Sequence, residues 1–302
     1  MGKLRSRLYG ILLGLVVAGS AAAGPVEDGF DAYSRGDFAK AVEIWRPYAE
    51  NGDAQAQAFL GDMYYAGQGV ARDDKQALFW FKLAADKGNV SAEFNLGLAA
   101  EMGRGQPRSA AQALGWYKKA ATAGKVPAML ALARLSRVGG AGVERDLDAA
   151  ARWTERGAKT GDPQAQDELG ALYRLGQGVP PDLNKAREWY LKAAMQGYAP
   201  AENNIAMMYR YGAGGPVDFE RAFGWLHRAA DHGVAAAKYN IGAMYALGLG
   251  ASKNRVEAYG WYVAAINGGD PNIRAQAEQA LALLKAELKP AELSAVERSL
   301  AH

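Results

Sequence analysis

The 302-residue chain contains no cysteine and only three histidines, His227, His232 and His302. Without cysteine there can be no disulfide, thiol nucleophile, thiolate metal site or lipid-attachment cysteine. His227 and His232 are five residues apart, whereas a metal-chelating histidine pair on a helix needs a spacing of four. The sequence also lacks the GxSxG, SxxK, HExxH and GxxxxGK[ST] motifs in a supporting context. We therefore expect no catalytic residues, no metal and no cofactor, and we interpret the chain as a non-enzyme.

Charge of one sign and long apolar runs are also scarce. Lys3, Arg5 and Arg7 are the only charged residues before Gly24, and without that segment 32 basic and 32 acidic side chains remain. Such a balance gives no reason to expect nucleic-acid binding. The apolar run Leu8–Gly19 has about 12 residues, fewer than the roughly 20 that span a bilayer as a helix.

The first 23 residues have the order of parts found in a secretory signal peptide. A basic start is followed by the apolar run and by Ala21-Ala22-Ala23, a small-residue cleavage pattern. We expect cleavage after Ala23, and a periplasmic location in a diderm bacterium with no stable membrane insertion afterwards. The alternative is an uncleaved anchor.

What the chain does contain is a repeat. Its seven tryptophans are Trp45, Trp80, Trp116, Trp153, Trp189, Trp225 and Trp261, at intervals of 35 to 37 residues. A Leu or Ile followed by a small residue, here called the landmark, recurs in step with them at Leu60, Leu96, Leu132, Leu169, Ile205 and Ile241. A glycine pair follows each landmark, as in Gly176-Gln-Gly178. Three features in register over six copies indicate a tandem repeat protein.

One unit has the pattern of a helical hairpin. In residues 163–175 the apolar side chains fall near helical spacing, and the glycine pair then ends the helix. Seven residues before each of the last six tryptophans stands a residue that can cap a second helix: Asp73, Ser109, Asp146, Asp182, Asp218 and Asn254. Because the tryptophans lie among small residues on these second helices, we expect all seven rings in the core.

The pattern LGxxYxxGxGVxxDxxKAxxWYxKAA resembles the Sel-one-like repeat (SLR), a relative of the tetratricopeptide repeat. The copies at 53–88, 162–197 and 198–233 match it well, whereas Ala100 and Ser136 replace the expected tyrosine in 89–124 and 125–161. The resemblance implies an all-α fold, a right-handed α-solenoid of stacked antiparallel helix hairpins. It also implies a binding scaffold, without indicating the partner.

The expected organisation has four parts. Residues 1–23 are the signal peptide, and 25–52 form a divergent capping hairpin. Residues 53–268 hold six repeats: 53–88, 89–124, 125–161, 162–197, 198–233 and 234–268. Residues 269–302 form C-terminal capping helices, with Asp270-Pro271 as the helix start.

Function should lie on the concave surface that first helices line in superhelical arrays. By analogy with tetratricopeptide repeats, the inward positions lie two before, two after and five after the landmark, on one helix face. These positions and further first-helix candidates give a predicted partner-binding groove of Arg134, Arg137, Asp167, Arg174, Asn203, Met207, Arg210, Phe94 and Tyr239.

Arg137, Arg174 and Arg210 occupy the last of these positions in consecutive repeats, and we call them the arginine ladder. Arginine pairs bidentately with carboxylates, so the ladder predicts an acidic protein or peptide segment as partner. The alternative is that these arginines are solvated or bridge to acids in the next repeat, such as Asp167. The sequence thus favours an exported, non-enzymatic scaffold, a periplasmic adaptor or regulator. An envelope hydrolase or peptidoglycan-acting protein and a purely structural spacer are the alternatives.

Overall fold

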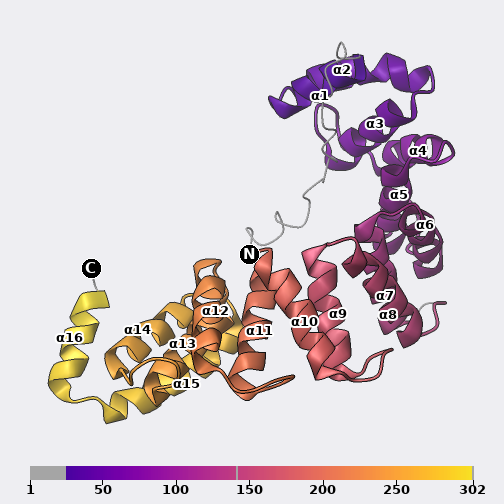
Figure 1. The fold of residues 1–302 in the computed structure, drawn as a ribbon. Coiled ribbons are helices and arrows are strands. Elements are labelled where there is room, and N and C mark those ends of the chain that lie inside the picture. Colours follow the sequence, from indigo (N-terminus) through magenta and orange to yellow (C-terminus); the bar gives the residue numbers. More distant parts are fainter. Residues whose placement is uncertain (1–24, 141, 301–302) are drawn as a thin grey trace. The chain divides into compact units, whose positions relative to one another are not determined.

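The computed structural model describes residues 25–140 and 142–300, and within them the chain forms sixteen α-helices and no β-strand (Figure 1). The predicted all-α solenoid of helix hairpins is confirmed. The predicted signal peptide and His302 lie outside the described residues. The chain divides into two compact units, which we describe separately. Unit 1 comprises residues up to Leu96 with Arg104–Gln106, and unit 2 comprises Gly97–Gly103 and everything from Pro107 onward.

The helices follow the repeat. The first helices of the repeats each have 13 residues and are α3 (Ala54–Ala66), α5 (Val90–Met102), α7 (Val126–Val138), α9 (Pro163–Leu175), α11 (Ala199–Tyr211) and α13 (Ala235–Leu247). The second helices are α4 (Asp74–Ala85), α6 (Ala110–Thr122), α8 (Leu147–Lys159), α10 (Leu183–Met195), α12 (Phe219–Asp231) and α14 (Arg255–Ile266). The flanking helices are α1 (Pro25–Ser34), α2 (Phe38–Glu50), α15 (Pro271–Glu287) and α16 (Pro290–Leu300).

The predicted helix caps are confirmed. Each of the six residues expected to cap a second helix does so, its side chain accepting a hydrogen bond from a backbone N–H of the first turn. Asp270 does the same for α15. The first glycine of the pair ends α9 in the left-handed conformation at Gly176, with φ +65°. These local signals set the length of every hairpin before any packing is considered.

The core lies between the two helices of each hairpin. All six landmark residues are at most 2% exposed. The small residue after the landmark faces the residue that follows the repeat tryptophan on the second helix. Where that small residue is glycine, its partner is a buried aromatic ring, in the pairs Gly61 and Phe81, Gly97 and Tyr117, Gly170 and Tyr190, and Gly242 and Tyr262. A Cβ atom on any of these glycines would press into the ring.

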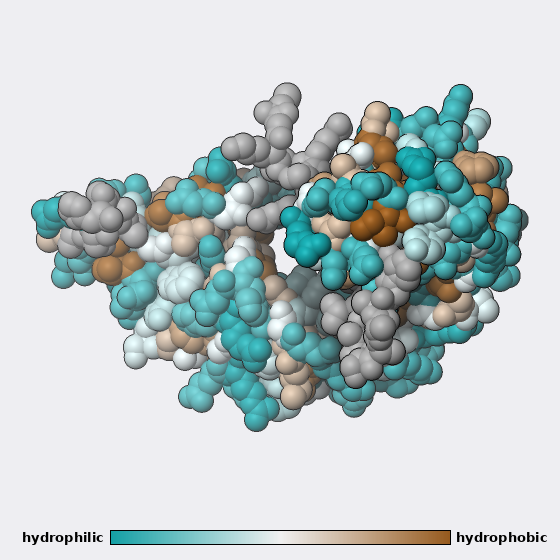
Figure 2. Space-filling view, turned by 90° about the horizontal axis from the view of Figure 1, so that it is seen from above, coloured by the Kyte–Doolittle hydropathy of each residue, from teal (hydrophilic) through white to brown (hydrophobic). Residues whose placement is uncertain are grey.

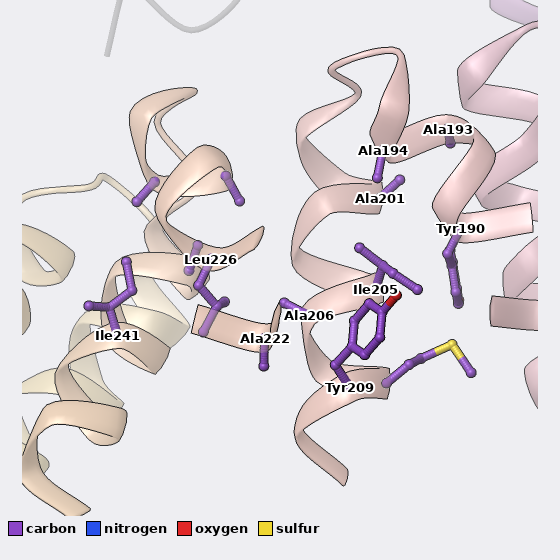
Figure 3. Close-up of a cluster of buried hydrophobic side chains, with 14 of the residues drawn as sticks. Tyr190, Ala193, Ala194, Ala201, Ile205, Ala206, Tyr209, Ala222, Leu226 and Ile241 are labelled. Carbon is purple, nitrogen blue, oxygen red and sulfur yellow. The ribbon is translucent and has the colours of Figure 1, made fainter. Parts of the chain in front are cut away.

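The two repeats with alanine after the landmark show the complementary arrangement. Ala206 is accompanied by Leu226, and both belong to the buried cluster drawn in Figure 3. Ala133 is accompanied by Thr154, and a void of about 10 Å³ remains beside them. A glycine after the landmark therefore faces an aromatic ring, and an alanine there faces a smaller leucine or threonine. Close packing at a fixed helix separation requires this compensation in size.

The tryptophans differ from the expectation. Trp45 and Trp80 are buried, but the rings of Trp116, Trp153, Trp189, Trp225 and Trp261 are only partly buried. The fully buried position is the one after the tryptophan, where the second helix faces the first. On four second helices a cation three residues later lies over the indole: Lys119, Arg156, Lys192 and Arg228. These rings thus cover the core edge and support charged side chains.

The pairing of residue sizes is testable at Gly170. A methyl group there would lie 2.9 Å from Tyr190 Cδ1, so Gly170→Ala should lower the free energy of unfolding by about 2 kcal/mol. Combining it with Tyr190→Leu reproduces the alanine and leucine pair of the next repeat. The double variant should therefore be destabilised by less than the sum of the two single variants, by about 1 kcal/mol in denaturant titrations.

Gly224→Ala is the matched control, because a Cβ at this helical glycine meets nothing within 4 Å. It should stabilise the protein by about 0.5–1 kcal/mol. Strict additivity of the two changes at Gly170 and Tyr190 would contradict the proposed dependence of one size on the other.

Candidate functional site

The predicted groove residues fall on first helices, and all but Phe94 lie in unit 2. Arg134 and Arg137 are on α7, Asp167 and Arg174 on α9, Asn203, Met207 and Arg210 on α11, and Tyr239 on α13. Phe94 lies on α5 in unit 1 and is not considered part of the same site. We call the surface formed by the unit 2 members the first-helix face.

Consecutive first helices of unit 2 contact one another across this face. Arg134 of α7 forms an ion pair with Glu101 of α5 at 2.6 Å, and Glu101 also accepts a hydrogen bond from the Tyr117 hydroxyl at 2.9 Å. The Asn204 amide of α11 donates to Asp167 of α9 at 2.8 Å. These bonds place neighbouring first helices side by side. Arg134 therefore has a structural partner already and is a weaker candidate for binding a ligand.

The three ladder arginines have a different environment. Arg137 and Arg174 are exposed, and Arg210 is half-buried. Arg174 Nε donates to the Tyr190 hydroxyl at 3.4 Å, and Arg210 Nη1 donates to Asn240 Oδ1 at 3.1 Å. Within the part of the chain that the structure describes, none of the three forms an ion pair with a carboxylate. Their positive charges are therefore not neutralised by such a contact.

Asp167 is the acidic member of the face. Partial burial is the main cause that raises its pKa from 3.8 to about 6, while the hydrogen bond from Asn204 and the charge of Arg174 act in the opposite direction. Removing a carboxylate from water disfavours its charged form. Near neutral pH Asp167 is ionised and places one negative charge among the arginines.

The remaining predicted residues contribute more to packing. Met207 is partly buried and packs against the core around Ile205. The Tyr239 ring lies 5.7 Å from the Tyr262 ring, between centroids. The Asn203 side-chain oxygen is buried and has no hydrogen-bond partner among the described residues.

Sequence inspection missed one feature of this surface. Five large apolar side chains are more than half exposed at the same repeat position, the last residue of the first helices α5, α7, α9, α11 and α13: Met102, Val138, Leu175, Tyr211 and Leu247. We call them the terminal stripe. Each directly follows the ladder position in sequence and precedes the first turn glycine, so the repeat register would have revealed them. In Figure 2, hydrophobic residues appear on the viewed face as separate patches among hydrophilic ones.

Neither histidine of the described chain has the surroundings of a metal site. The His227 ring stacks edgewise on Phe223 and Trp261, and His232 Nδ1 lies 2.7 Å from the buried carboxylate of Glu202. Across residues 25–140 and 142–300, no group of three or more metal-ligating side chains is placed to hold an ion. Nor does any helix in these ranges have the length and apolar character needed to cross a bilayer.

Comparison with known proteins identifies the family. The model of the Sel1 repeat matches six segments, residues 54–89, 90–125, 126–162, 163–198, 199–234 and 235–270. The chain belongs to the Sel1 repeat family. The Sel-one-like resemblance seen in the sequence is thereby confirmed. Comparison with curated protein sequences gave no match.

Solved structures agree with membership of the Sel1 repeat family. A Sel1 repeat protein from Oxalobacter formigenes is 30% identical with a TM-score of 0.69, over 80% of this chain and 96% of that one. A protective antigen of uropathogenic Escherichia coli strains, which has an SLR fold, is 23% identical with a TM-score of 0.52, over 90% and 82%. Yeast Tom70, 13% identical with a TM-score of 0.52 over 94% and 70%, shares the fold alone. Sel1 repeat solenoids are typically scaffolds for protein–protein interaction and are generally non-enzymatic.

The ionisation of Asp167 gives a pH-dependent test of the site. Because the folded state holds this proton more tightly than the unfolded chain, stability falls as the pH rises from about 4 to about 6. Asp167→Asn should therefore raise the free energy of unfolding by about 1–2 kcal/mol at pH 7 and change it little at pH 4. Urea titrations at both pH values measure this. An equal effect at the two pH values would show that packing, and not ionisation, is responsible.

Proposed function

We propose that the protein is an exported scaffold that binds an acidic segment of a protein partner on the first-helix face of unit 2. The observation that carries the proposal is the arginine ladder, three guanidinium groups at one position of consecutive repeats, none of which lies within ion-pair distance of a carboxylate in the described chain. A preformed face of this kind binds through charge complementarity and a few anchoring side chains, with no chemistry required.

The alternative of an envelope hydrolase requires an acid or a histidine of shifted pKa beside a nucleophile. Asp167 has the shifted pKa, and its neighbouring charges are those of Glu168 and Arg174. Its hydrogen-bond partner among the described residues is the amide of Asn204, which is neither a nucleophile nor a base. This hydrogen bond therefore favours the binding function.

The ladder is tested by replacing Arg137, Arg174 and Arg210 together with Ala. Because the arginines are at least partly exposed, the melting temperature should change by only a few degrees, while partner capture in crosslinking pull-downs from the envelope fraction should fall at least about tenfold. The matched control replaces Lys118, Arg152 and Arg221, exposed cations on second helices, and removes the same charge elsewhere. If the ladder variant captures its partner as well as the wild type does, the ladder is not the binding site.

Export rests on the basic start, apolar run and alanine triplet of residues 1–23. Expressed from its own start codon in a diderm bacterium, the protein should be released by osmotic shock, and mass spectrometry should find Gly24 at its N-terminus. Leu13→Arg interrupts the apolar run and should leave the full-length chain in the cytoplasm. Recovery of uncleaved wild-type protein from the membrane would instead support the anchor.

A further inference from the structure

The terminal stripe is not a scatter of single exposed residues. Its members occupy one repeat position in five successive repeats, with exposures of 51% for Met102, 68% for Val138, 51% for Leu175, 68% for Tyr211 and 62% for Leu247. Single exposed apolar residues are ordinary. A set that recurs at one position of successive repeats instead presents apolar contacts at regular intervals along the stack. All five belong to unit 2, so the stripe lies within one compact body.

Cations line the stripe. The ladder arginines immediately precede Val138, Leu175 and Tyr211 in sequence, and the Arg210 guanidinium lies over the Tyr211 ring at 5.3 Å. Arg108 and Arg145 reach the same helix ends, because their Nε atoms donate to the carbonyls of Glu101 and Arg137 at 2.9 and 3.2 Å. The acidic side chains nearby are Glu101, which is paired with Arg134, Glu144 in the turn after α7, and Asp167 and Glu168 on α9. The three ladder arginines with Arg108 and Arg145 outnumber the unpaired carboxylates, so the balance of charge along the stripe is positive.

The spacing limits the conformation of a ligand. Side-chain hydrogen bonds join α5 to α7, α9 to α11 and α11 to α13, so successive first helices are bridged by side chains and are not packed backbone to backbone. Their separation is therefore at least the roughly 10 Å upper value for directly packed helices, and an extended chain advances about 3.3 Å per residue. One repeat corresponds to about three to four residues of an extended peptide.

We propose that the terminal stripe and the ladder together bind an extended peptide segment with an apolar residue at every third or fourth position and carboxylates between them. The apolar side chains cover the stripe, and the carboxylates pair with the arginines. This inference rests on the proposed function and adds to it the apolar component and the period of the ligand. The ladder alone would accept any acidic segment.

The test uses three fluorescein-labelled peptides at low ionic strength, with binding followed by fluorescence anisotropy. The probe is four repeats of Leu-Glu-Ser, and its controls are four repeats of Ser-Glu-Ser and four of Leu-Lys-Ser. The wild-type protein should bind Leu-Glu-Ser at least about tenfold more tightly than Ser-Glu-Ser, because each buried leucine adds apolar contact. It should bind Leu-Lys-Ser least, because like charges repel.

Two variants separate the inference from the proposed function. Replacing Leu175, Tyr211 and Leu247 with Ser should remove the preference for Leu-Glu-Ser and leave the weaker binding of Ser-Glu-Ser unchanged. The ladder variant should lose both. Retention of the full preference by the stripe variant would overturn the inference while the proposed function stands. Failure of both acidic peptides to bind the wild-type protein would overturn both.

Two controls test whether the effect is specific to the stripe and whether the variants are folded. Met195→Ser with Leu283→Ser removes exposed apolar surface outside the stripe and should not affect the preference. Circular dichroism should show that the variants are folded, because the stripe side chains are more than half exposed. If the triple variant is unstable, the single variant Leu175→Ser should lose part of the preference for Leu-Glu-Ser. Sedimentation tests whether a second copy of the chain covers the stripe instead of a peptide. A wild-type dimer that becomes a monomer in the stripe variant would show this and would contradict the inference.

Discussion

The hairpins are held together where the residue after each repeat tryptophan packs onto the small residue after the landmark. Glycine there accommodates a phenylalanine or tyrosine ring, as between Gly170 and Tyr190, whereas alanine accompanies the smaller Leu226 or Thr154. The combined volume of the residue after the landmark and the residue after the tryptophan sets the distance between the two helices of one hairpin. This contact fixes the rotation of both helices about their axes, and so it decides which way the other side chains of the repeat face. The half-exposed tryptophans, the terminal stripe and the ladder all face outward because the neighbouring positions are committed to the core.

A second set of contacts joins one hairpin to the next and uses polar groups. The residue before the landmark is asparagine in three repeats, and each asparagine bonds to the preceding first helix: Asn95 to Asp62, Asn204 to Asp167 and Asn240 to Arg210. The buried Glu202 instead joins the two helices of its own hairpin, through Arg228 and His232, and the pair of Gln166 and Gln196 occupies the equivalent place one repeat earlier. Polar side chains in register thus fix the stacking, because a buried polar group is costly unless it is paired.

Much of this fold could be predicted from the sequence, because its signals are local and repeated. The caps, the turn glycines and the burial of the landmarks each follow from residues a few positions apart. The burial of the tryptophans could not be predicted in the same way. An aromatic residue at a fixed repeat position indicates packing, but which of two adjacent residues enters the core depends on the rotation of the second helix. In the candidate site the register of the arginines was evident, whereas the pairing of Arg134 with Glu101 and the raised pKa of Asp167 arise between repeats and have no signal within one.

The variation along the stack then indicates where a ligand would lie. The ladder position holds Glu101, Arg137, Arg174, Arg210 and Ala246 through unit 2, so its positive charge is confined to three successive repeats. At one end stands Glu101, already paired with Arg134, and at the other stands Ala246, and neither offers the donors of arginine. The terminal stripe continues past both ends, at Met102 and Leu247. An acidic segment should therefore be centred on α7, α9 and α11, with apolar contacts extending one repeat further on either side. The residues at the core positions hold each repeat together and allow the repeats to stack. The exposed residues at the ladder and stripe positions determine what the stack binds.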